Sequence, residues 1–290
     1  MCDEFTARDE EAALTARGLD RRQFAAISAA AVIAGCTGGE SQARGGKLTE
    51  AMVTVDTPDG KADAFFVHPA SGRHPGVILW PDIAGLRDAY KTMARRLAAA
   101  GYAVLAVNQY YRSAPAPVLP SFAEWRTPEG QAKLRPMIAA INPAATTSDA
   151  GAFVRWLDAQ RAVDTRRKIG TNGYCMGGPF TVRTAAAAPG RVGAAASFHG
   201  AALVTPGADS PHLLLAATRA RYLFAIARND DARSPADKSV LQDTARVAGR
   251  TAEVEVYPAD HGWCTLDAPS YDQVQADRAW GRMLELFKGL

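Results

Sequence analysis

The hexapeptide Gly-Tyr-Cys-Met-Gly-Gly places one cysteine, Cys175, between glycines, and it is the stretch of the chain best suited to do chemistry. A short strand is predicted over 168–172 and a helix rich in small residues over 179–188. A nucleophile between a strand and a helix sits on a sharp, strained turn, so its neighbours must be small. The amide of Met176 then lies at a helix N-terminus, where the dipoles favour a thiolate and later an oxyanion. The pattern predicts a nucleophilic cysteine, although a core cysteine between loop glycines has the same local sequence.

Three further polar stretches each follow a predicted strand: Trp80-Pro81-Asp82-Ile83-Ala84-Gly85, Arg228-Asn229-Asp230-Asp231 and Asp260-His261-Gly262-Trp263. Because ligands bind outside the carboxyl ends of strands in a parallel sheet, we expect these stretches to meet Cys175. A free thiol is mostly protonated at neutral pH, and His261 is the candidate base that activates it. Asp230 is the candidate acid that fixes the imidazole tautomer. The order nucleophile, acid, histidine is that of an α/β-hydrolase triad.

Asp231 is an alternative acid, and the residues leave the choice open. Distance from the preceding strand favours Asp230, whereas distance back from Pro235 favours Asp231. We expect Asp230 to be the acid and Asp231 to cap the next helix. His199 ends another predicted strand beside Gly200, where it could line a pocket, but a structural role is the preferred interpretation.

Length, charge and cysteine content limit the kind of protein. The 290 residues are 48% hydrophobic, which is enough for a full core in one α/β unit. The net charge is only +3 and no basic run follows one face, which argues against nucleic acid as a partner. The four cysteines, at Cys2, Cys36, Cys175 and Cys264, fit neither a zinc site nor a disulfide framework. We therefore expect no metal, a small-molecule partner and a monomeric chain.

The first 46 residues have the composition of an export signal followed by a flexible tether. Arg21 and Arg22 precede the short apolar run 25–34, which is the arrangement of a twin-arginine signal. The run ends in Ile-Ala-Gly-Cys, which resembles a bacterial lipobox in which Cys36 is lipidated after cleavage. We expect an exported protein, periplasmic or anchored to the membrane as a lipoprotein, with its hydrolase domain over 47–290. The alternative is an amphipathic helix at the N-terminus of a cytosolic protein.

The rest of the chain alternates strands with helices. An Asp-Gly turn joins two strands into an antiparallel hairpin, and the buried runs that follow predict a mostly parallel sheet with helices on both faces. The long segment 108–143 is expected to contain a helix and to cover the site. Ser148 is the predicted cap of the helix that follows. The predicted strands are 52–55, 64–68, 76–80, 102–107, 168–172, 192–198, 222–227 and 253–257, and the predicted helices are 88–100, 149–160, 179–188, 235–248 and 271–290.

Four motifs together resemble the dienelactone hydrolase family of α/β hydrolases: Gly-Tyr-Cys-Met-Gly-Gly, Asp-Ile-Ala-Gly, Asn-Asp-Asp and His-Gly-Trp. The likeness covers roughly residues 48–290, and the cysteine turn is its most specific part. The resemblance implies a triad of Cys175, His261 and Asp230. It also implies an oxyanion hole formed by the backbone N–H groups of Ile83 and Met176. The implied reaction is the hydrolysis of a cyclic enol-lactone to the open-chain acid, without metal or organic cofactor.

The chain departs from the family pattern at Asp82, where family members carry a glutamate that contacts and helps to activate the resting thiol. The side chain here is one methylene shorter, which puts that activation in doubt. Arg112, with Tyr110 or Tyr111, is a candidate for binding a substrate carboxylate. A surface salt bridge is an equally good interpretation of Arg112. The export signal is a second departure, because well-known family members are cytosolic.

Two other functions remain open at this stage. A broad-specificity carboxylesterase would use the same residues on a wider range of esters. A lipid-anchored binding protein would keep the hydrolase fold with an inactive site, since a fold does not determine a function.

Overall fold

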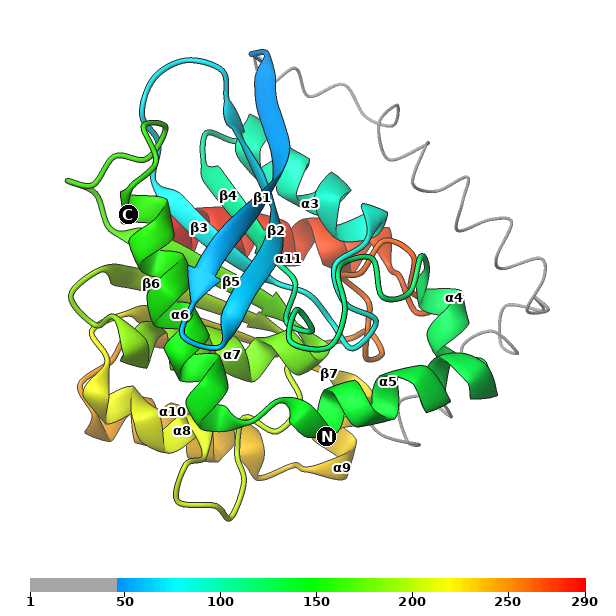
Figure 1. The fold of residues 1–290 in the computed structure, drawn as a ribbon. Coiled ribbons are helices and arrows are strands. Elements are labelled where there is room, and N and C mark those ends of the chain that lie inside the picture. The colour runs from blue at the N-terminus through cyan, green and yellow to red at the C-terminus, as the bar shows by residue number, and fades with distance from the viewer. Residues whose placement is uncertain (1–45) are drawn as a thin grey trace.

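The computed structural model describes residues 46–290 (Figure 1). The twin-arginine signal, Cys36 and all but the last residue of the tether lie outside the described residues. An eight-stranded sheet runs in the order β1-β2-β4-β3-β5-β6-β7-β8. The strands are β1 Leu48–Thr57, β2 Gly60–Pro69, β3 Gly76–Trp80, β4 Ala103–Val107, β5 Ile169–Tyr174, β6 Val192–Phe198, β7 Arg221–Ala227 and β8 Ala252–Tyr257.

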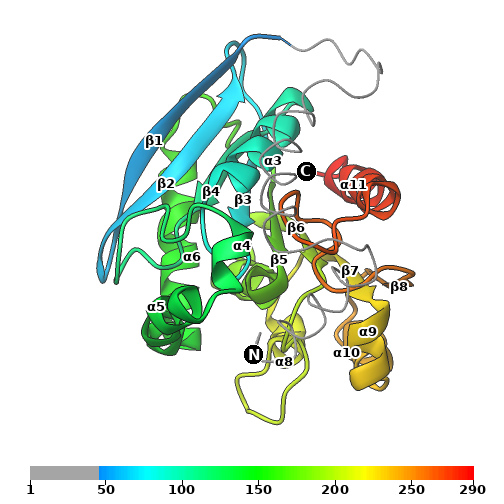
Figure 2. The same ribbon diagram turned by 90° about the vertical axis from the view of Figure 1, so that its right-hand side faces the viewer.

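The sheet is antiparallel at one end and parallel over the rest. β1 pairs with β2, and β2 with β4, in antiparallel register, whereas every other neighbouring pair is parallel. Figure 2 shows the hairpin of β1 and β2 at one end of the sheet and β8 at the other. The predicted fold class is confirmed, and the hairpin strands are longer than the sequence indicated.

Helices of different lengths connect and cover the strands. They are α3 Asp88–Ala99, α4 Phe122–Trp125, α5 Pro128–Ala140, α6 Pro143–Asp158, α7 Gly178–Ala187, α8 Pro211–Leu214, α9 Arg228–Arg233, α10 Asp237–Val247 and α11 Gln273–Phe287, with 3-10 turns η1 Cys175–Gly177 and η2 Leu215–Ala217.

The core has two layers because successive strand side chains point to opposite faces of the sheet. Val77 and Leu79 of β3 pack with residues of α3 and α11, whereas Ile78 and Trp80 pack with residues of α6, α7 and α10. In Figure 1, α6 lies in front of the sheet and α11 behind it. Each fully buried aliphatic or aromatic side chain contributes about 1.5–3 kcal/mol, so both layers hold the strand ends rigidly.

The segment between β4 and α6 contains two helices, α4 and α5, where we predicted at least one. Their apolar side chains form a third, smaller cluster that includes Ile83 and Leu134 and is contacted by Met176. This cluster therefore joins the covering segment to both loops that were predicted to carry the oxyanion hole.

The predicted start of α6 was wrong. Asn142, not Ser148, is the N-cap, and its side-chain oxygen accepts a hydrogen bond from the Ala145 N–H at 2.9 Å. Pro143 occupies the first helical position, where its missing N–H costs no hydrogen bond. Ser148 thus lies within the helix.

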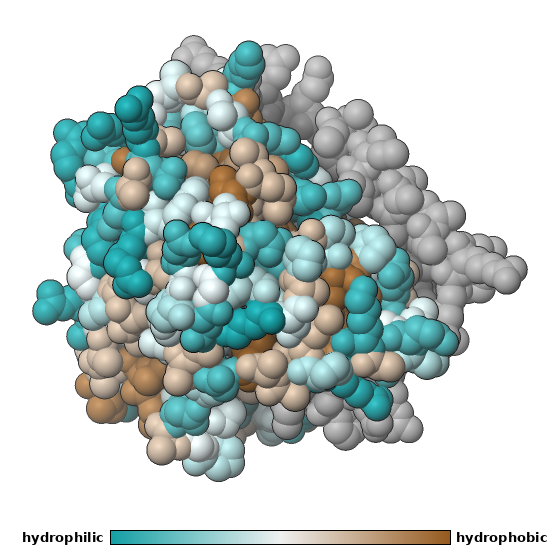
Figure 3. Space-filling model, viewed as in Figure 1, coloured by the Kyte–Doolittle hydropathy of each residue, from teal (hydrophilic) through white to brown (hydrophobic). Residues whose placement is uncertain are grey.

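One face of the described part shows how its surface side chains are distributed. Figure 3 shows hydrophilic side chains over much of one face, with smaller apolar areas between them. Within residues 46–290, no helix combines the length and the apolar composition that crossing a bilayer requires.

Candidate active site

Cys175 sits on the turn between β5 and α7 with a left-handed backbone, φ 51°. Residues other than glycine rarely adopt this backbone conformation, so the surrounding structure must hold Cys175 in it. A Cβ added to Gly173 would lie 2.1 Å from the Gly177 carbonyl oxygen, and one added to Gly177 would lie 2.4 Å from that of Trp80. Both glycines are therefore required by close backbone approach. The turn has the geometry of a nucleophile elbow, as the sequence predicted.

His261 follows β8, and its ring contacts Asp230 of α9. The His261 Nδ1 and Asp230 Oδ2 atoms are 2.7 Å apart. The His261 backbone is fixed on both sides, because its N–H donates to Asn229 Oδ1 and its carbonyl oxygen accepts from Ser270 Oγ. His261 is buried, so the contact is shielded from water. The structure thus holds the imidazole in one orientation against one carboxylate.

Asp231, the alternative acid, contacts a different side chain. Its Oδ2 lies 2.8 Å from Lys238 Nζ. The prediction that Asp231 caps the next helix was wrong, because α10 begins after Ala236 without a side-chain cap. Asp230 and Asp231 instead both lie in the first turn of the short helix α9. Adjacent helical positions point in different directions, which is why only Asp230 faces the ring.

His199 contacts both Cys175 and His261, although the sequence analysis preferred a structural role for it over one in the pocket. Its Nδ1 accepts a hydrogen bond from the Cys175 N–H at 3.1 Å, which places the proton of a neutral ring on Nε2. The ring packs edge-on against His261 and Trp263, with centroids 4.9 and 5.1 Å away. Burial, and secondarily His261, lowers the pKa of His199 well below its usual value. His199 therefore stays neutral beside His261 and fixes the nucleophile backbone.

Arg87, which the sequence analysis did not single out, clamps two loops of the site together. The fully buried guanidinium binds both carboxylate oxygens of Asp82 at 2.7 and 3.0 Å and both of Asp267 at 2.7 and 2.8 Å. Its fifth N–H bond goes to the Gly85 carbonyl oxygen, so every donor has an acceptor. Burial opposes the charge, but Asp267 and Asp82 outweigh it and raise the pKa of Arg87.

The Asp82 carboxylate therefore does not take the thiol-activating role of the family glutamate, which its shorter side chain had already put in doubt. Its carboxylate accepts from Arg87 and from the Ala84 N–H, and these contacts do not place it on the thiol. The aspartate side chain is shorter than that of the family glutamate, which keeps the Asp82 carboxylate close to its own loop and fits this arrangement. Asp82 positions the loop that carries Ile83 instead of contacting the sulfur.

The two residues predicted to form the oxyanion hole lie on neighbouring elements. Met176 follows Cys175 in η1, and Ile83 follows Asp82 in the loop after β3. Tyr110 connects them, because its hydroxyl donates to the Ile83 carbonyl oxygen at 2.7 Å and lies 3.8 Å from the Met176 sulfur. Both backbone segments are thus held by the same buried tyrosine.

Arg112 and Tyr111 do not line the site, so the structure does not place them where a substrate carboxylate would bind. Arg112 forms ion pairs of 2.6 Å with Asp59 of the hairpin loop and 2.7 Å with Asp149 of α6. The Tyr111 hydroxyl donates to the same Asp149, and burial raises its pKa to about 12. The salt-bridge interpretation of Arg112 fits these contacts.

Cys264 is the second buried cysteine of the described region. It packs in the core layer that also contains Tyr174 and Trp263. Burial raises the pKa of its thiol well above the usual value. Within residues 46–290, no group of three or more His, Cys, Asp or Glu side chains could hold a metal ion.

A cavity of about 790 Å³ adjoins the elbow. Its walls come from the end of α4, α5, the start of α6, η1, the first two turns of α7 and the loop after β6. They include Trp125, Ile138, Met176 and Phe180. The Ala201 N–H of that loop donates to the Cys175 carbonyl oxygen at 3.2 Å, which ties the cavity wall to the nucleophile turn. The volume is in the range of small-molecule sites.

The sheet order, the elbow and the histidine after the last strand define an α/β hydrolase. The chain belongs to the dienelactone hydrolase family, whose sequence profile matches residues 62–290. This places it among the carboxylic ester hydrolases, as the sequence resemblance predicted.

Curated relatives match nearly the whole described region. A candidate carboxymethylenebutenolidase of Synechocystis sp. is 28% identical over 247 residues, covering 82% of this chain and 95% of the relative. A protein of the same description from Escherichia coli K12 is 27% identical, covering 83% of this chain and 87% of its own.

Solved structures show the same fold. A candidate dienelactone hydrolase of Klebsiella pneumoniae superposes with a TM-score of 0.71 at 23% identity, covering 84% of this chain and all of that one. A dienelactone hydrolase-like promiscuous phosphotriesterase from metagenomic libraries gives 0.67 at 24% identity, covering 84% and 98%.

Proposed function

We propose that the chain hydrolyses a lactone or an activated carboxylic ester through an acyl-enzyme on Cys175. The observation that carries the proposal is the 2.7 Å contact between His261 and Asp230, with the His261 ring packed on His199, which accepts from the Cys175 N–H on the nucleophile elbow. The Asp230 carboxylate accepts a hydrogen bond from the Nδ1–H group of His261, which leaves the Nε2 lone pair to take the thiol proton.

The thiolate attacks the carbonyl carbon, and the carbonyl π electrons move to oxygen. The N–H groups of Ile83 and Met176 then bind the oxyanion, each contributing about 2.7–4 kcal/mol to transition-state stabilisation. Collapse of the intermediate expels the alkoxide or enolate, which takes the proton held by His261. Water, deprotonated by His261, attacks the thioester and releases the acid and the thiol. A thiolate is a good leaving group, so activated esters and enol-lactones suit this site better than amides.

Detection of the covalent intermediate tests the proposal. The protein is mixed with 4-nitrophenyl acetate, quenched in acid within the first turnovers and mapped by peptide mass spectrometry. We expect an acetyl group on the peptide containing Cys175 and none on that containing Cys264. Steady turnover without acetylation at Cys175 would contradict the mechanism. An absence of both acetylation and turnover would favour an inactive binding protein.

A panel of substrates separates the lactonase from a broad carboxylesterase. A dienelactone and a series of unrelated aryl esters are compared by kcat/KM. Preference for the lactone by more than about tenfold supports a dienelactone-like function, and similar values across the panel support the broader esterase.

We also propose that the first 46 residues export the chain and that Cys36 carries a lipid. The proposal rests on Arg21, Arg22 and the Ile-Ala-Gly-Cys sequence. Cell fractionation tests it: replacing both arginines by lysine is expected to keep the protein in the cytoplasm. Replacing Cys36 by serine is expected to abolish labelling with radioactive palmitate, and unchanged labelling would contradict lipidation at this residue.

A further inference from the structure

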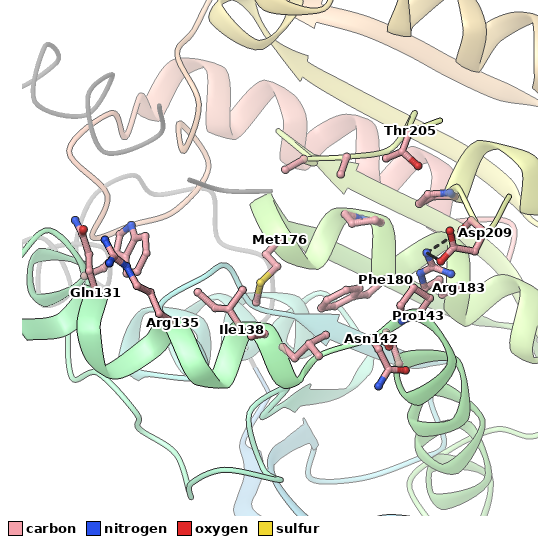
Figure 4. Close-up of a pocket in the computed structure, with 18 residues that line it drawn as sticks. Gln131, Arg135, Ile138, Asn142, Pro143, Met176, Phe180, Arg183, Thr205 and Asp209 are labelled. Carbon is pink, nitrogen blue, oxygen red and sulfur yellow. Dashed lines mark hydrogen bonds and ion pairs between the residues drawn. The ribbon is translucent and has the colours of Figure 1, made fainter. Parts of the chain in front are cut away.

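The cavity beside the elbow is apolar in the middle and charged at its ends. Figure 4 shows Met176 and Ile138 facing each other in the middle, with Arg135 and Gln131 at one end and Arg183 beside Asp209 at the other. An apolar ligand segment therefore fits the centre, and a charged ligand group has places to bind at the ends.

One face of α7 connects the nucleophile turn to Arg183. Met176 of η1 and Pro179, Phe180 and Arg183 of α7 all line the cavity. Their spacing of i, i+3, i+4 and i+7 places them along one side of this helical stretch. The helical rise places the Arg183 backbone about 10 Å from that of Met176 along the axis. A ligand that begins at the oxyanion position and follows this face thus reaches the guanidinium at its far end.

Arg183 is buried without a full set of partners. The residue is 8% exposed. Its Nη2 donates to the Asp209 carbonyl oxygen at 2.9 Å, and the Asp209 carboxylate is 3.9 Å away on a side chain that is 60% exposed. Within residues 46–290, the Nε and Nη1 groups have no hydrogen-bond partner.

This arrangement contrasts with that of Arg87, where all five donors are bound. The unused donors belong to a side chain that lines the cavity, and a planar carboxylate is the group that can bind two of them at once. Burial lowers the pKa of Arg183, against the opposing effect of Asp209, but a guanidinium still remains charged at neutral pH. The cavity therefore offers a cation about two helical turns beyond Met176.

The position of His261 determines which half of the substrate enters the cavity. His261 must reach the leaving group to protonate it, and it does not line the cavity, whereas Met176 does. The leaving group and the acyl group extend to different sides of the carbonyl carbon. The leaving group thus belongs on the His261 side, and the acyl chain belongs in the cavity.

We infer that Arg183 selects acyl groups that carry a carboxylate at the far end of an apolar chain about 10 Å long. The substrate class is a half-ester of a medium-chain dicarboxylic acid or an acyl group of similar shape. This inference rests on the proposed function and narrows its substrate. A compact lactone with its carboxylate beside the ring would not reach Arg183.

The test compares 4-nitrophenyl half-esters of adipic, suberic and sebacic acids with the same esters capped by methanol at the free carboxylate. We expect the uncapped suberic ester to exceed its capped form in kcat/KM by about tenfold or more, and the adipic pair to show a much smaller ratio. Arg183→Gln should reduce the suberic ratio by about tenfold. Arg135→Gln, which removes a cation from the exposed end of the same cavity, should leave the ratio within about twofold.

The possible results distinguish a failure of the proposed function from a failure of the inference about Arg183. If no ester is hydrolysed, the proposed function fails. If capped esters are hydrolysed but the free carboxylate gives no advantage at any length, only the inference fails. If Arg135→Gln lowers the ratio as much as Arg183→Gln does, the preference reflects general charge attraction, and the inference is overturned. Should Arg183→Gln fail to fold, the chain-length dependence of the parent protein and the variant Arg183→Lys, expected to keep part of the ratio, decide the question.

Discussion

Cys175 and Cys264 are both buried, yet their surroundings offer the two sulfurs opposite electrostatic conditions. Cys175 has a left-handed backbone at the start of a helix, and its N–H is bound by His199. Cys264 packs among aromatic core residues, and burial raises its pKa well above the usual value. Burial alone therefore suppresses a thiolate, whereas burial at a helix N-terminus beside an imidazole can support one. The comparison separates a structural cysteine from a nucleophile within one chain.

Removing each sulfur gives the largest predicted contrast. Cys175→Ala should lower kcat/KM for an activated ester by a factor of about 10⁴ or more, because the covalent step is lost. Cys264→Ala should retain activity within a few-fold and cost on the order of 1 kcal/mol of stability. Ester hydrolysis and urea unfolding measure the two effects. Equal losses of activity in both variants would break the comparison.

The two neighbouring carboxylates provide the second contrast. Asp230→Asn should lower kcat by about 10³–10⁴-fold, because the amide favours the wrong tautomer of His261. Asp231→Asn should remain within a few-fold of the parent, since Asp231 contacts Lys238 and not the ring. Steady-state kinetics with both variants checks the assignment. A larger loss in Asp231→Asn would identify it as the acid.

Arg87 stabilises two loops of the active site, the surroundings of Cys175, through packing and charge. Arg87→Met should reduce the free energy of unfolding by about 3–5 kcal/mol, because Asp82 and Asp267 remain buried without a cation. The matched control is Arg112→Met, whose ion pairs are partly exposed and contribute less. Urea denaturation compares the two variants. A similar loss of stability in both variants would show that the buried ion pairs of Arg87 contribute no more than the ion pairs of Arg112.

Alkylation compares the two thiols directly and gives the smallest predicted effect. Iodoacetamide should label Cys175 below pH 8 at least about tenfold faster than Cys264. Because the pKa of Cys264 is raised, its thiolate fraction stays low as pH rises through the range in which an ordinary thiol ionises. Peptide mass spectrometry over a pH series follows both sites. Faster labelling of Cys264 would reverse the proposed roles.

The elbow and the mostly parallel sheet could be predicted from sequence, because glycine spacing and buried apolar runs mark them locally. Gly173 is required by a clash with the Gly177 carbonyl a few residues later, whereas Gly177 is required by the distant Trp80 carbonyl. The buried runs mark strands without reference to partners. The start of α6 was harder, since Asn142 and Ser148 are both good caps. Pro143 favours the earlier one, because proline suits the first helical position.

The clamp of Arg87 could not be predicted, because its partners lie far away in the chain. Asp267 is 180 residues after Arg87, and no local pattern marks the pair. The choice between the two interpretations of Arg112 could not be made from sequence for the same reason, since its partners come from the hairpin loop and α6. His199 was noticed at its strand end, but only the register of β5 and β6 shows that it reaches Cys175.

The clamp also sets an order in which a newly made chain can be completed. Arg87 and Asp82 leave the ribosome together with the first parallel strand, whereas Asp267 follows 180 residues after Arg87. Until the stretch around Asp267 joins the fold, Arg87 has one of its two carboxylates, and the elbow has no imidazole. The clamp and the triad are thus completed together, only after β8 and the loop that follows it have been made.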